Sequence, residues 1–297
     1  MRRWVKASRP DTSTHLPIHP SSHLRDTPAF LMCKPTHFRI AYEINPWMRL
    51  TRQPNHRLAV KQWNILYRLL TQQLGAQVRL MPPHPSVPDL VFTANAGLAD
   101  GRTVIRSNFR FPQRQRETPL VERYFRRAGY RIVSLPPRFD FEGEGDALWM
   151  GETLVFGFRY RSTAPAHAHL ARRLRTEVLP VELVDRRFYH LDTCFCPLDA
   201  STALWYPKAF DRYGRKVIER LVEDLVSVSE RDAMRFVCNA IVVGRSVVLP
   251  GGFSQAVRRQ LTRRGFRLYP VDLSEFLKAG GAAKCLVLRL GAPDFAD

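Results

Sequence analysis

Apolar residues recur at helical spacing in five separate parts of the chain. In the clearest part, Leu58, Trp63 and Leu66 fall on one face of a helix. This helix and another end at Gly75 and Gly129, because glycine readily adopts the left-handed backbone that closes a helix. The spacing predicts amphipathic helices near residues 56–74, 118–128, 164–176, 209–224 and 253–264.

A short strand, a turn and a second short apolar strand follow each predicted helix. The first strands and their turns lie at residues 74–83, 128–137, 176–185, 222–230 and 264–273. The second strands are predicted at residues 90–92, 147–150, 194–198, 240–244 and 285–290. Similar units that cannot bury their apolar faces alone pack against one another. The chain therefore predicts five helix–strand–turn–strand units around a common axis, with the helices outside.

Each unit carries its unusual polar residues at the same place, in the turn between its two strands. In chain order these residues are Asp89 and Asn95, then Glu142, Glu144 and Asp146, then His190 and Asp192, then Asn239, and finally Cys285. If the units share one axis, the turns converge at one end of it. A thiol, an imidazole and carboxylates would then meet in one cavity, which favours nucleophilic catalysis on a cationic carbon.

Each of these residues also has an ordinary structural explanation. A single histidine beside aliphatic residues is often structural, an asparagine in a turn serves the turn, and most buried cysteines are inert. We interpret Cys194 and Cys238 as core thiols for this reason. The coincidence of position across five units favours a functional site.

Composition narrows the class of protein. The chain has 297 residues, of which 45% are hydrophobic, and no apolar run approaches the ~18 residues that span a bilayer. The five cysteines are an odd number, so we interpret them as thiols of a cytoplasmic protein. Cys194 and Cys196 have no second Cys/His cluster in register, and we predict no metal site.

Composition along the chain divides it into three segments, and its net charge raises an alternative to an enzyme. Residues 1–27 are predicted to be a flexible basic tail, residues 28–293 a single catalytic domain, and residues 294–297 a C-terminal tail. The net charge of +19 is also compatible with a catalytically silent basic module that binds nucleic acid. Because the basic residues are scattered in ones and twos, we do not expect nucleic acid to be the main partner.

Four segments together resemble a known superfamily. PDLVFTANAG, FEGEGDAL, FYHLDTCF and the final GG…C are similar to the guanidine-modifying enzymes of the pentein superfamily. AYEINPWM at residues 41–48, with the asparagine of FTAN, is most similar to the arginine dihydrolase branch. The resemblance covers about residues 30 to 290. It implies a five-bladed α/β propeller around a central active-site cavity, with no metal or organic cofactor.

The resemblance also implies roles for individual residues. Cys285 matches the nucleophile, His190 the general acid/base, and Glu142 a catalytic carboxylate that pairs with the guanidinium. Arg161 resembles the arginine that holds the substrate's α-carboxylate, and Arg159 is its rival. The residues expected to bind the substrate are Asn45, Asp89, Phe92, Asn95, Asp146, Arg161, Asp192 and Asn239.

The resemblance implies a small guanidino substrate, most plausibly L-arginine, hydrolysed through a covalent thiouronium to ornithine, carbon dioxide and ammonia. An arginine deiminase, a dimethylarginine dimethylaminohydrolase or an amidinotransferase is the alternative within the superfamily. Asn95 stands where deiminases have an aspartate, which would permit a second hydrolysis of the neutral ureido group. Lys284 directly precedes the cysteine and, on a strand, would point to the opposite face. A homo-oligomer is compatible with the sequence.

Overall fold

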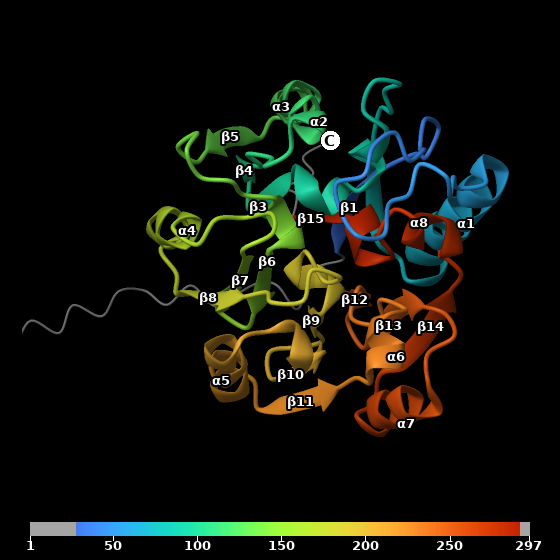
Figure 1. Ribbon diagram of the computed structural model, residues 1–297, viewed down its shortest axis with the longest axis vertical. Helices are drawn as coiled ribbons and strands as arrows, with labels where there is room; N and C mark the ends of the chain where they lie inside the picture. Colours follow the sequence, from blue (N-terminus) through green and yellow to red (C-terminus); the bar gives the residue numbers. More distant parts are fainter. Residues whose placement is uncertain (1–27, 292–297) are drawn as a thin grey trace, which may run out of the picture.

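Five three-stranded sheets surround a common axis in the computed structural model, which describes residues 28–291 (Figure 1). The orders of the strands are β15-β1-β2, β3-β4-β5, β6-β7-β8, β11-β10-β9 and β12-β13-β14. The strands are β1 (Ala29–Cys33), β2 (Gln77–Met81), β3 (Gly97–Asp100), β4 (Thr103–Arg106), β5 (Arg131–Ser134), β6 (Ala147–Met150), β7 (Thr153–Phe158), β8 (Val178–Glu182), β9 (Phe195–Pro197), β10 (Thr202–Trp205), β11 (Asp224–Ser227), β12 (Ile241–Val243), β13 (Ser246–Pro250), β14 (Arg267–Val271) and β15 (Leu288–Leu290). The five-bladed propeller is thereby confirmed.

In every blade the central strand pairs antiparallel with one neighbour and parallel with the other. In one of them β6 pairs antiparallel with β7, with Ala147 opposite Phe156, and β7 pairs in parallel with β8, with Leu154 opposite Val178. The antiparallel pair is joined by a tight turn, whereas the parallel pair needs a crossover, which a helix provides. The blade that closes the ring differs only in chain order, because β15 pairs antiparallel with β1.

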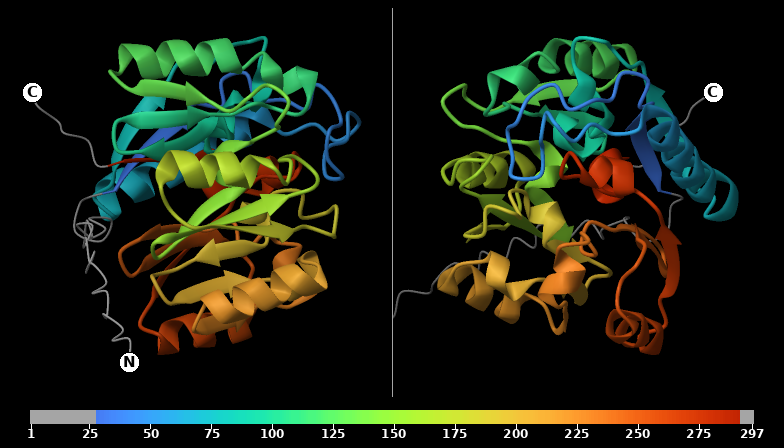
Figure 2. Two further views of the ribbon diagram at one scale, coloured as in Figure 1. Left: turned by 90° about the vertical axis from the view of Figure 1, so that its left-hand side faces the viewer. Right: turned by 45° about the vertical axis from the view of Figure 1, so that its right-hand side comes forward.

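The five predicted helices are confirmed and lie on the outer surface (Figures 1 and 2). They are α1 (His56–Arg68), extended by the π-helical turn η2 (Leu69–Gln73), α3 (Thr118–Arg127), α4 (Ala166–Leu174), α5 (Arg212–Leu221) and α7 (Gln255–Arg263). Side chains of Asn55, Asp211 and Ser254 cap α1, α5 and α7 by accepting hydrogen bonds from backbone N–H groups. Shorter helices are α2 (Pro112–Gln115), α6 (Glu230–Ala233) and α8 (Ser274–Leu277).

Two predicted strands are wrong in part or in full. Residues 90–92 lie at the end of a 3-10 helix, η3 (Pro88–Val91), because Pro88 fixes its own backbone angle at the first position and offers no N–H to a strand. The innermost strand of that blade begins later, at Gly97. In the last unit only Leu288–Leu290 is a strand, and Lys284 and Cys285 lie in the 3-10 turn η8 (Lys284–Leu286).

The sequence analysis predicted two strands in each unit, whereas each blade has three. The central strands β1, β10 and β13 are buried at every residue, so they show no alternation of apolar and polar side chains. The predicted tails at residues 1–27 and 294–297 lie outside the described residues. Within residues 28–291, no helix has both the length and the apolar character needed to cross a membrane.

Candidate active site

The predicted site residues come from short turns that lie at the axial end of the blades. Asn95 lies in η4 (Thr93–Ala96), and Glu142 and Asp146 flank η5 (Gly143–Gly145). His190 precedes η6 (Leu191–Thr193), which contains Asp192, and Cys285 is the middle residue of η8. The turns η7 (Pro207–Ala209) and η3 complete the 3-10 turns of the described chain. The structure thus brings together residues that are far apart in the sequence.

The Cys285 thiol is held by two side chains. Its Sγ donates to Asp192 Oδ2 at 3.3 Å and accepts from Asn239 Nδ2 at 3.1 Å. Asn239 Oδ1 in turn accepts from the Cys285 backbone N–H at 3.2 Å. Burial, and then the Asp192 carboxylate, raise the pKa of Cys285 well above its ordinary value. The free protein therefore holds this sulfur as a thiol.

The imidazole of His190 is bound to a fully buried carboxylate. His190 Nε2 lies 2.9 Å from Glu142 Oε2, which also accepts from Arg161 Nη1 at 3.0 Å. Burial alone would raise the pKa of Glu142, but the Arg161 guanidinium and the bond from His190 hold it well below its ordinary range. Burial is the main cause that lowers the pKa of His190 to about 4, and the Glu142 carboxylate offsets it only in part.

Asp192 joins the thiol and the imidazole, because it lies two residues after His190 in the same turn. Its Oδ2 accepts from the thiol, whereas its buried Oδ1 has no hydrogen-bond partner among residues 28–291. Burial raises the pKa of Asp192 to about 7, and the Lys284 cation opposes this rise. A buried carboxylate oxygen without a partner is costly, so it marks a place where a cationic ligand would be stabilised.

Asp146 is buried at the end of η5 and contacts the turn that carries His190. Its Oδ2 accepts from Ser162 Oγ at 2.6 Å and its Oδ1 accepts from the Leu191 backbone N–H at 3.2 Å. Ser162 Oγ also accepts from the Glu142 backbone N–H at 3.1 Å. Asp146 is not among the residues that line the hollow described next, and its contacts fix the two turns that carry Glu142 and His190.

A hollow of about 10 Å³ opens beside this cluster. Of the predicted residues, Asn45, Asp89, Phe92, Asn95 and Arg161 line it. Asp89 Oδ1 is buried and has no partner with hydrogen-bond geometry in the described part of the chain, as for Asp192. Burial raises the pKa of Asp89, and the Tyr42 hydroxyl, which acts on its carboxylate, opposes this rise. The remaining lining residues are Ile44, Met48, Arg114, Tyr189 and Ala279.

Arg114 is the charged lining residue that the sequence interpretation missed. Its Nη1 donates to Asn95 Oδ1 at 2.7 Å, and its Nε and Nη2 donate to the Glu117 carboxylate at 2.7 and 2.9 Å. In the sequence it belongs to FRFPQRQRE, whose arginines would be expected to be exposed to solvent. The only signal was Glu117 three residues later, which is the spacing of an ion pair along a helix.

Arg161 lines the hollow, whereas its rival Arg159 does not. The Arg161 guanidinium lies between the rings of Phe111 and Tyr189, at 4.8 and 4.7 Å from their centroids. The Arg159 side chain is 49% exposed and pairs with Glu182 at the surface. The site therefore contains two buried guanidinium groups, those of Arg114 and Arg161.

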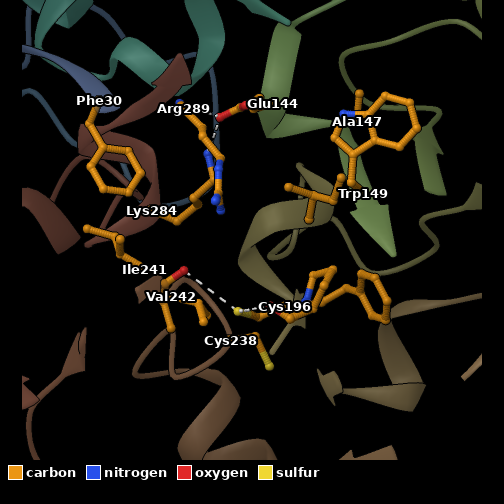
Figure 3. A pocket seen from close by; sticks show the side chains of 14 residues that line it. Phe30, Glu144, Ala147, Trp149, Cys196, Cys238, Ile241, Val242, Lys284 and Arg289 are labelled. Atoms are coloured by element: carbon orange, nitrogen blue, oxygen red, sulfur yellow. Dashed lines mark hydrogen bonds and ion pairs between the residues drawn. The ribbon is translucent and has the colours of Figure 1, made fainter. Parts of the chain in front are cut away.

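A larger cavity, of about 120 Å³, lies elsewhere in the propeller (Figure 3). Rings and aliphatic side chains form most of its wall, together with the thiols of Cys196 and Cys238. Glu144 and Lys284 line this cavity and bind each other there, so neither of them reaches the hollow beside Asp89. Among the described residues, no group of three or more His, Cys, Asp or Glu side chains is placed to hold a metal ion.

Comparisons with known proteins agree with this geometry. Residues 35–291 match the family model described as N,N dimethylarginine dimethylhydrolase, eukaryotic. The chain is 46% identical to the bifunctional arginine dihydrolase/ornithine cyclodeaminase AgrE of Nostoc sp., with 89% of this chain and 38% of that protein covered. It is 38% identical to the N(G),N(G)-dimethylarginine dimethylaminohydrolase of Mycobacterium tuberculosis, with 91% of this chain and 88% of that protein covered.

A solved structure shows the same fold. The N-terminal domain of ArgZ, an arginine dihydrolase from cyanobacteria, was solved as a cysteine-to-serine mutant bound to substrate. The TM-score is 0.85 at 42% sequence identity, with 90% of this chain and 99% of that chain covered. The match therefore extends over nearly the whole of that domain, whereas this chain spans well under half the length of AgrE.

Proposed function

The chain belongs to the N,N-dimethylarginine dimethylhydrolase family, and we propose that it is a cysteine-dependent hydrolase that converts L-arginine to ornithine, carbon dioxide and ammonia. One observation carries the proposal: a buried Asp192 oxygen without a partner lies on the carboxylate that holds the Cys285 thiol. A planar guanidinium cation would bind that carboxylate and bring its central carbon to the sulfur. The arginine dihydrolases AgrE and ArgZ support the choice of substrate.

The two ends of arginine correspond to the two kinds of charge in the site. The unpartnered oxygens of Asp89 and Asp192 suit the guanidinium, and the guanidiniums of Arg114 and Arg161 suit the α-carboxylate. Asn45, Phe92 and Asn95 would shape the space between the two ends. Asn239 would keep the sulfur in place through its hydrogen bond.

The reaction proceeds through the sulfur of Cys285. A bound cation favours the thiolate over the thiol, and transfer of the thiol proton to His190 accompanies attack on the guanidinium carbon. His190 then gives that proton to the departing nitrogen, so ammonia leaves and a thiouronium remains on the sulfur. Glu142 holds His190 in position for both transfers.

Water completes the first round. His190 accepts a proton from water, the hydroxide attacks the thiouronium carbon, and the carbon–sulfur bond breaks to give the neutral ureido product, with the proton of the added hydroxyl passing to the sulfur. The proton on His190 leaves with the released ammonia as ammonium, so the imidazole is neutral again for the second round. A second round on the ureido group releases the second ammonia and then ornithine and carbon dioxide. Asn95 favours this second round, because a neutral amide accepts an uncharged ureido group more readily than a carboxylate would.

Hydrolysis of methylated arginine is the second candidate, since the Mycobacterium tuberculosis relative bears that name at 38% identity. A panel of arginine, methylated arginines and citrulline separates the two, with ornithine, citrulline, ammonia and methylamines measured. Ornithine with two ammonia per arginine is the expected result. Citrulline as the only end product would contradict the dihydrolase proposal, and methylamine release without arginine turnover would favour the second candidate.

A further inference from the structure

A buried ion pair lies behind Asn95, the residue that favours the second hydrolysis in the proposal above. Arg114 Nε and Nη2 donate to the two carboxylate oxygens of Glu117 at 2.7 and 2.9 Å, and the two side chains are 4% and 2% exposed. Arg114 Nη2 also donates to Asp89 O at 3.3 Å, and the guanidinium lies 4.7 Å from the centroid of the Phe109 ring. Because its carboxylate binds two nitrogens at once, Glu117 fixes the plane of the guanidinium.

The remaining nitrogen of Arg114 determines which way the Asn95 amide points. Arg114 Nη1 donates to Asn95 Oδ1 at 2.7 Å, and Asn95 Nδ2 donates to Glu142 O at 3.3 Å. A guanidinium has donors and no acceptor, so the atom of Asn95 that meets it is the oxygen. The Glu142 carbonyl accepts and cannot donate, so it selects the same orientation from the other side of the amide.

The nitrogen of Asn95 consequently lies on the side of the reacting residues. A Cβ at Gly145 would collide with Asn95 Nδ2 and lie 3.2 Å from the His190 ring, so the amide nitrogen and the imidazole border the same position. Asn95 Nδ2 carries two hydrogens, and within residues 28–291 its one acceptor is Glu142 O. Since Asn95 lines the small hollow, its second N–H is available to a ligand there.

We propose that Glu117 is a positioning residue that acts through Arg114 to hold the Asn95 amide nitrogen toward the substrate, and that this orientation adapts the site to the ureido group of the second round. The inference rests on the proposed function, because the ureido compound is the product of its first hydrolysis. A ureido group has a carbonyl oxygen that accepts a hydrogen bond, whereas a guanidinium offers donors alone. The Asn95 N–H therefore suits the ureido group, and Asn95 Oδ1 would suit the guanidinium.

The ion pair makes the opposite orientation of the amide costly. If Asn95 turned over, its nitrogen would face the Arg114 donors and its oxygen would face Glu142 O, and two buried hydrogen bonds would be lost. Arg114 imposes this cost as long as Glu117 keeps the guanidinium in place. Loss of the Glu117 carboxylate would release the guanidinium and allow the two orientations of Asn95 to exchange.

The test compares two variants of the whole chain with citrulline and arginine as substrates. In Glu117→Gln we expect kcat/KM for citrulline to fall by about ten-fold relative to kcat/KM for arginine, the effect of one hydrogen bond. Glu122→Gln is the matched control, because Glu122 pairs with Arg106 at 2.7 Å on the adjoining helix α3, and its ratio should stay within about two-fold of the wild type. A structural role alone would lower both kcat/KM values in proportion. An unchanged ratio in Glu117→Gln, or an equal fall in Glu122→Gln, would overturn the proposal.

A second measurement needs no turnover and separates the inference from the proposed function. In Cys285→Ser protein, calorimetric titration gives the Kd of citrulline and of arginine, and adding Glu117→Gln should raise the first by about ten-fold relative to the second. If the wild type releases citrulline as its only end product but this shift appears, the dihydrolase proposal fails and the inference stands. If ornithine forms and the shift is absent, the inference alone fails.

A further variant keeps the test decisive if Glu117→Gln does not fold. Glu117→Asp retains the negative charge beside Arg114, but its side chain is one methylene shorter and cannot hold the guanidinium at its present distance from Asn95. The same ratio of Kd values should then rise by about three-fold or more. A ratio equal to that of the wild type in folded Glu117→Asp would overturn the proposal.

Discussion

The larger of the two cavities in the propeller is mostly apolar, and the smaller one carries the buried charges that suit a ligand. The larger one, of about 120 Å³, is walled mainly by rings and aliphatic side chains, whereas the hollow of about 10 Å³ is surrounded by buried charges. Asp89, which lines the small hollow, and Asp192, which holds the Cys285 thiol, each have a carboxylate oxygen without a partner among residues 28–291. The two unpartnered carboxylate oxygens, and not the larger volume, therefore support the small hollow as the place where a cationic ligand would bind.

The thiols of the two regions show the same difference. The Cys285 sulfur contacts the side chains of Asp192 and Asn239. Within residues 28–291, the Cys196 sulfur, at the larger cavity, makes hydrogen bonds only to the backbone carbonyls of Pro197 and Ala240 (Figure 3). Both thiols are buried and both pKa values are raised, that of Cys196 to about 12. Neighbouring side chains, more than burial, therefore distinguish the proposed nucleophile from the thiol at the larger cavity.

The largest expected effect separates these two thiols. Cys285→Ser should lower kcat by about 10⁴-fold or more, because a serine hydroxyl in this setting is a much weaker nucleophile. Cys196→Ala removes a sulfur of similar burial and should leave kcat within about three-fold of the wild type, since it loses only packing. Turnover of arginine and the mass of the protein after incubation measure both. A Cys285→Ser variant that retains most of its activity would show that the comparison of the two regions is wrong.

The second largest effect concerns the imidazole. His190→Gln should lower kcat by about 10² to 10⁴-fold, because a glutamine cannot carry the proton between sulfur, leaving nitrogen and water. His167 lies on the outer helix α4, away from the candidate site, and serves as the control. Its Nδ1 lies 2.6 Å from Ala164 O. Equal losses in His190→Gln and His167→Gln, measured by steady-state kinetics, would contradict the assignment.

The third prediction tests the charges at the hollow. Arg161→Lys should raise KM by about ten-fold or more, because an ammonium cannot reproduce the planar contacts between two rings and with Glu142. Arg159→Lys changes only a surface pair and should leave KM unchanged. An unchanged KM in Arg161→Lys, with the fold intact by circular dichroism, would remove Arg161 from the binding site.

The fourth prediction uses the close packing of the polar region. A Cβ at Gly145 would collide with Asn95 Nδ2 and lie 3.2 Å from the His190 ring. Gly145→Ala should therefore displace both and lower kcat by about ten-fold, with a loss of about 1–3 kcal/mol in the free energy of unfolding. Gly251→Ala, where the nearest atom is Val271 O at an ordinary 3.6 Å, is the control. Kinetics and urea unfolding measure the two effects.

The smallest effect on activity is expected at the larger cavity. Ile241→Ala widens its apolar wall and should lower the free energy of unfolding by about 2 kcal/mol or more. Since no reacting group lines this wall, kcat/KM should stay within about two-fold of the wild type. A large loss of activity without a loss of stability would indicate that this cavity takes part in the reaction.

Much of the fold could be predicted from the sequence, because the outer helices and the polar turns leave strong local patterns. Helices such as α1 have one buried face, so their apolar spacing is visible. The central strands β10 and β13 are buried throughout, so they resemble any other short apolar run. The helical turn over Pro88–Val91 was mistaken for a strand, because three apolar letters do not distinguish the two.

The candidate site could be predicted where its residues occupy equivalent turns or, as for Asn45 and Arg161, where the family resemblance covers them, but not elsewhere. Asn239, Asp192 and Cys285 stand in such turns and meet in the structure. Arg114 lies on a four-residue helix among other arginines, and only its three-dimensional surroundings distinguish it from Arg116, which is exposed. The pairing of Lys284 with Glu144 joins positions 140 residues apart, which no local pattern can indicate.

The antiparallel pairing of β15 with β1 has a consequence for the timing of activity. Cys285 lies three residues before β15, and the strand partner of β15 is β1, at the other end of the described chain. A growing polypeptide that has already made its histidine and its carboxylates still lacks a nucleophile beside them. On the proposed mechanism, the Cys285 sulfur joins the histidine and the carboxylates when β15 pairs with β1, so we expect molecules in which this pairing is missing to be inactive.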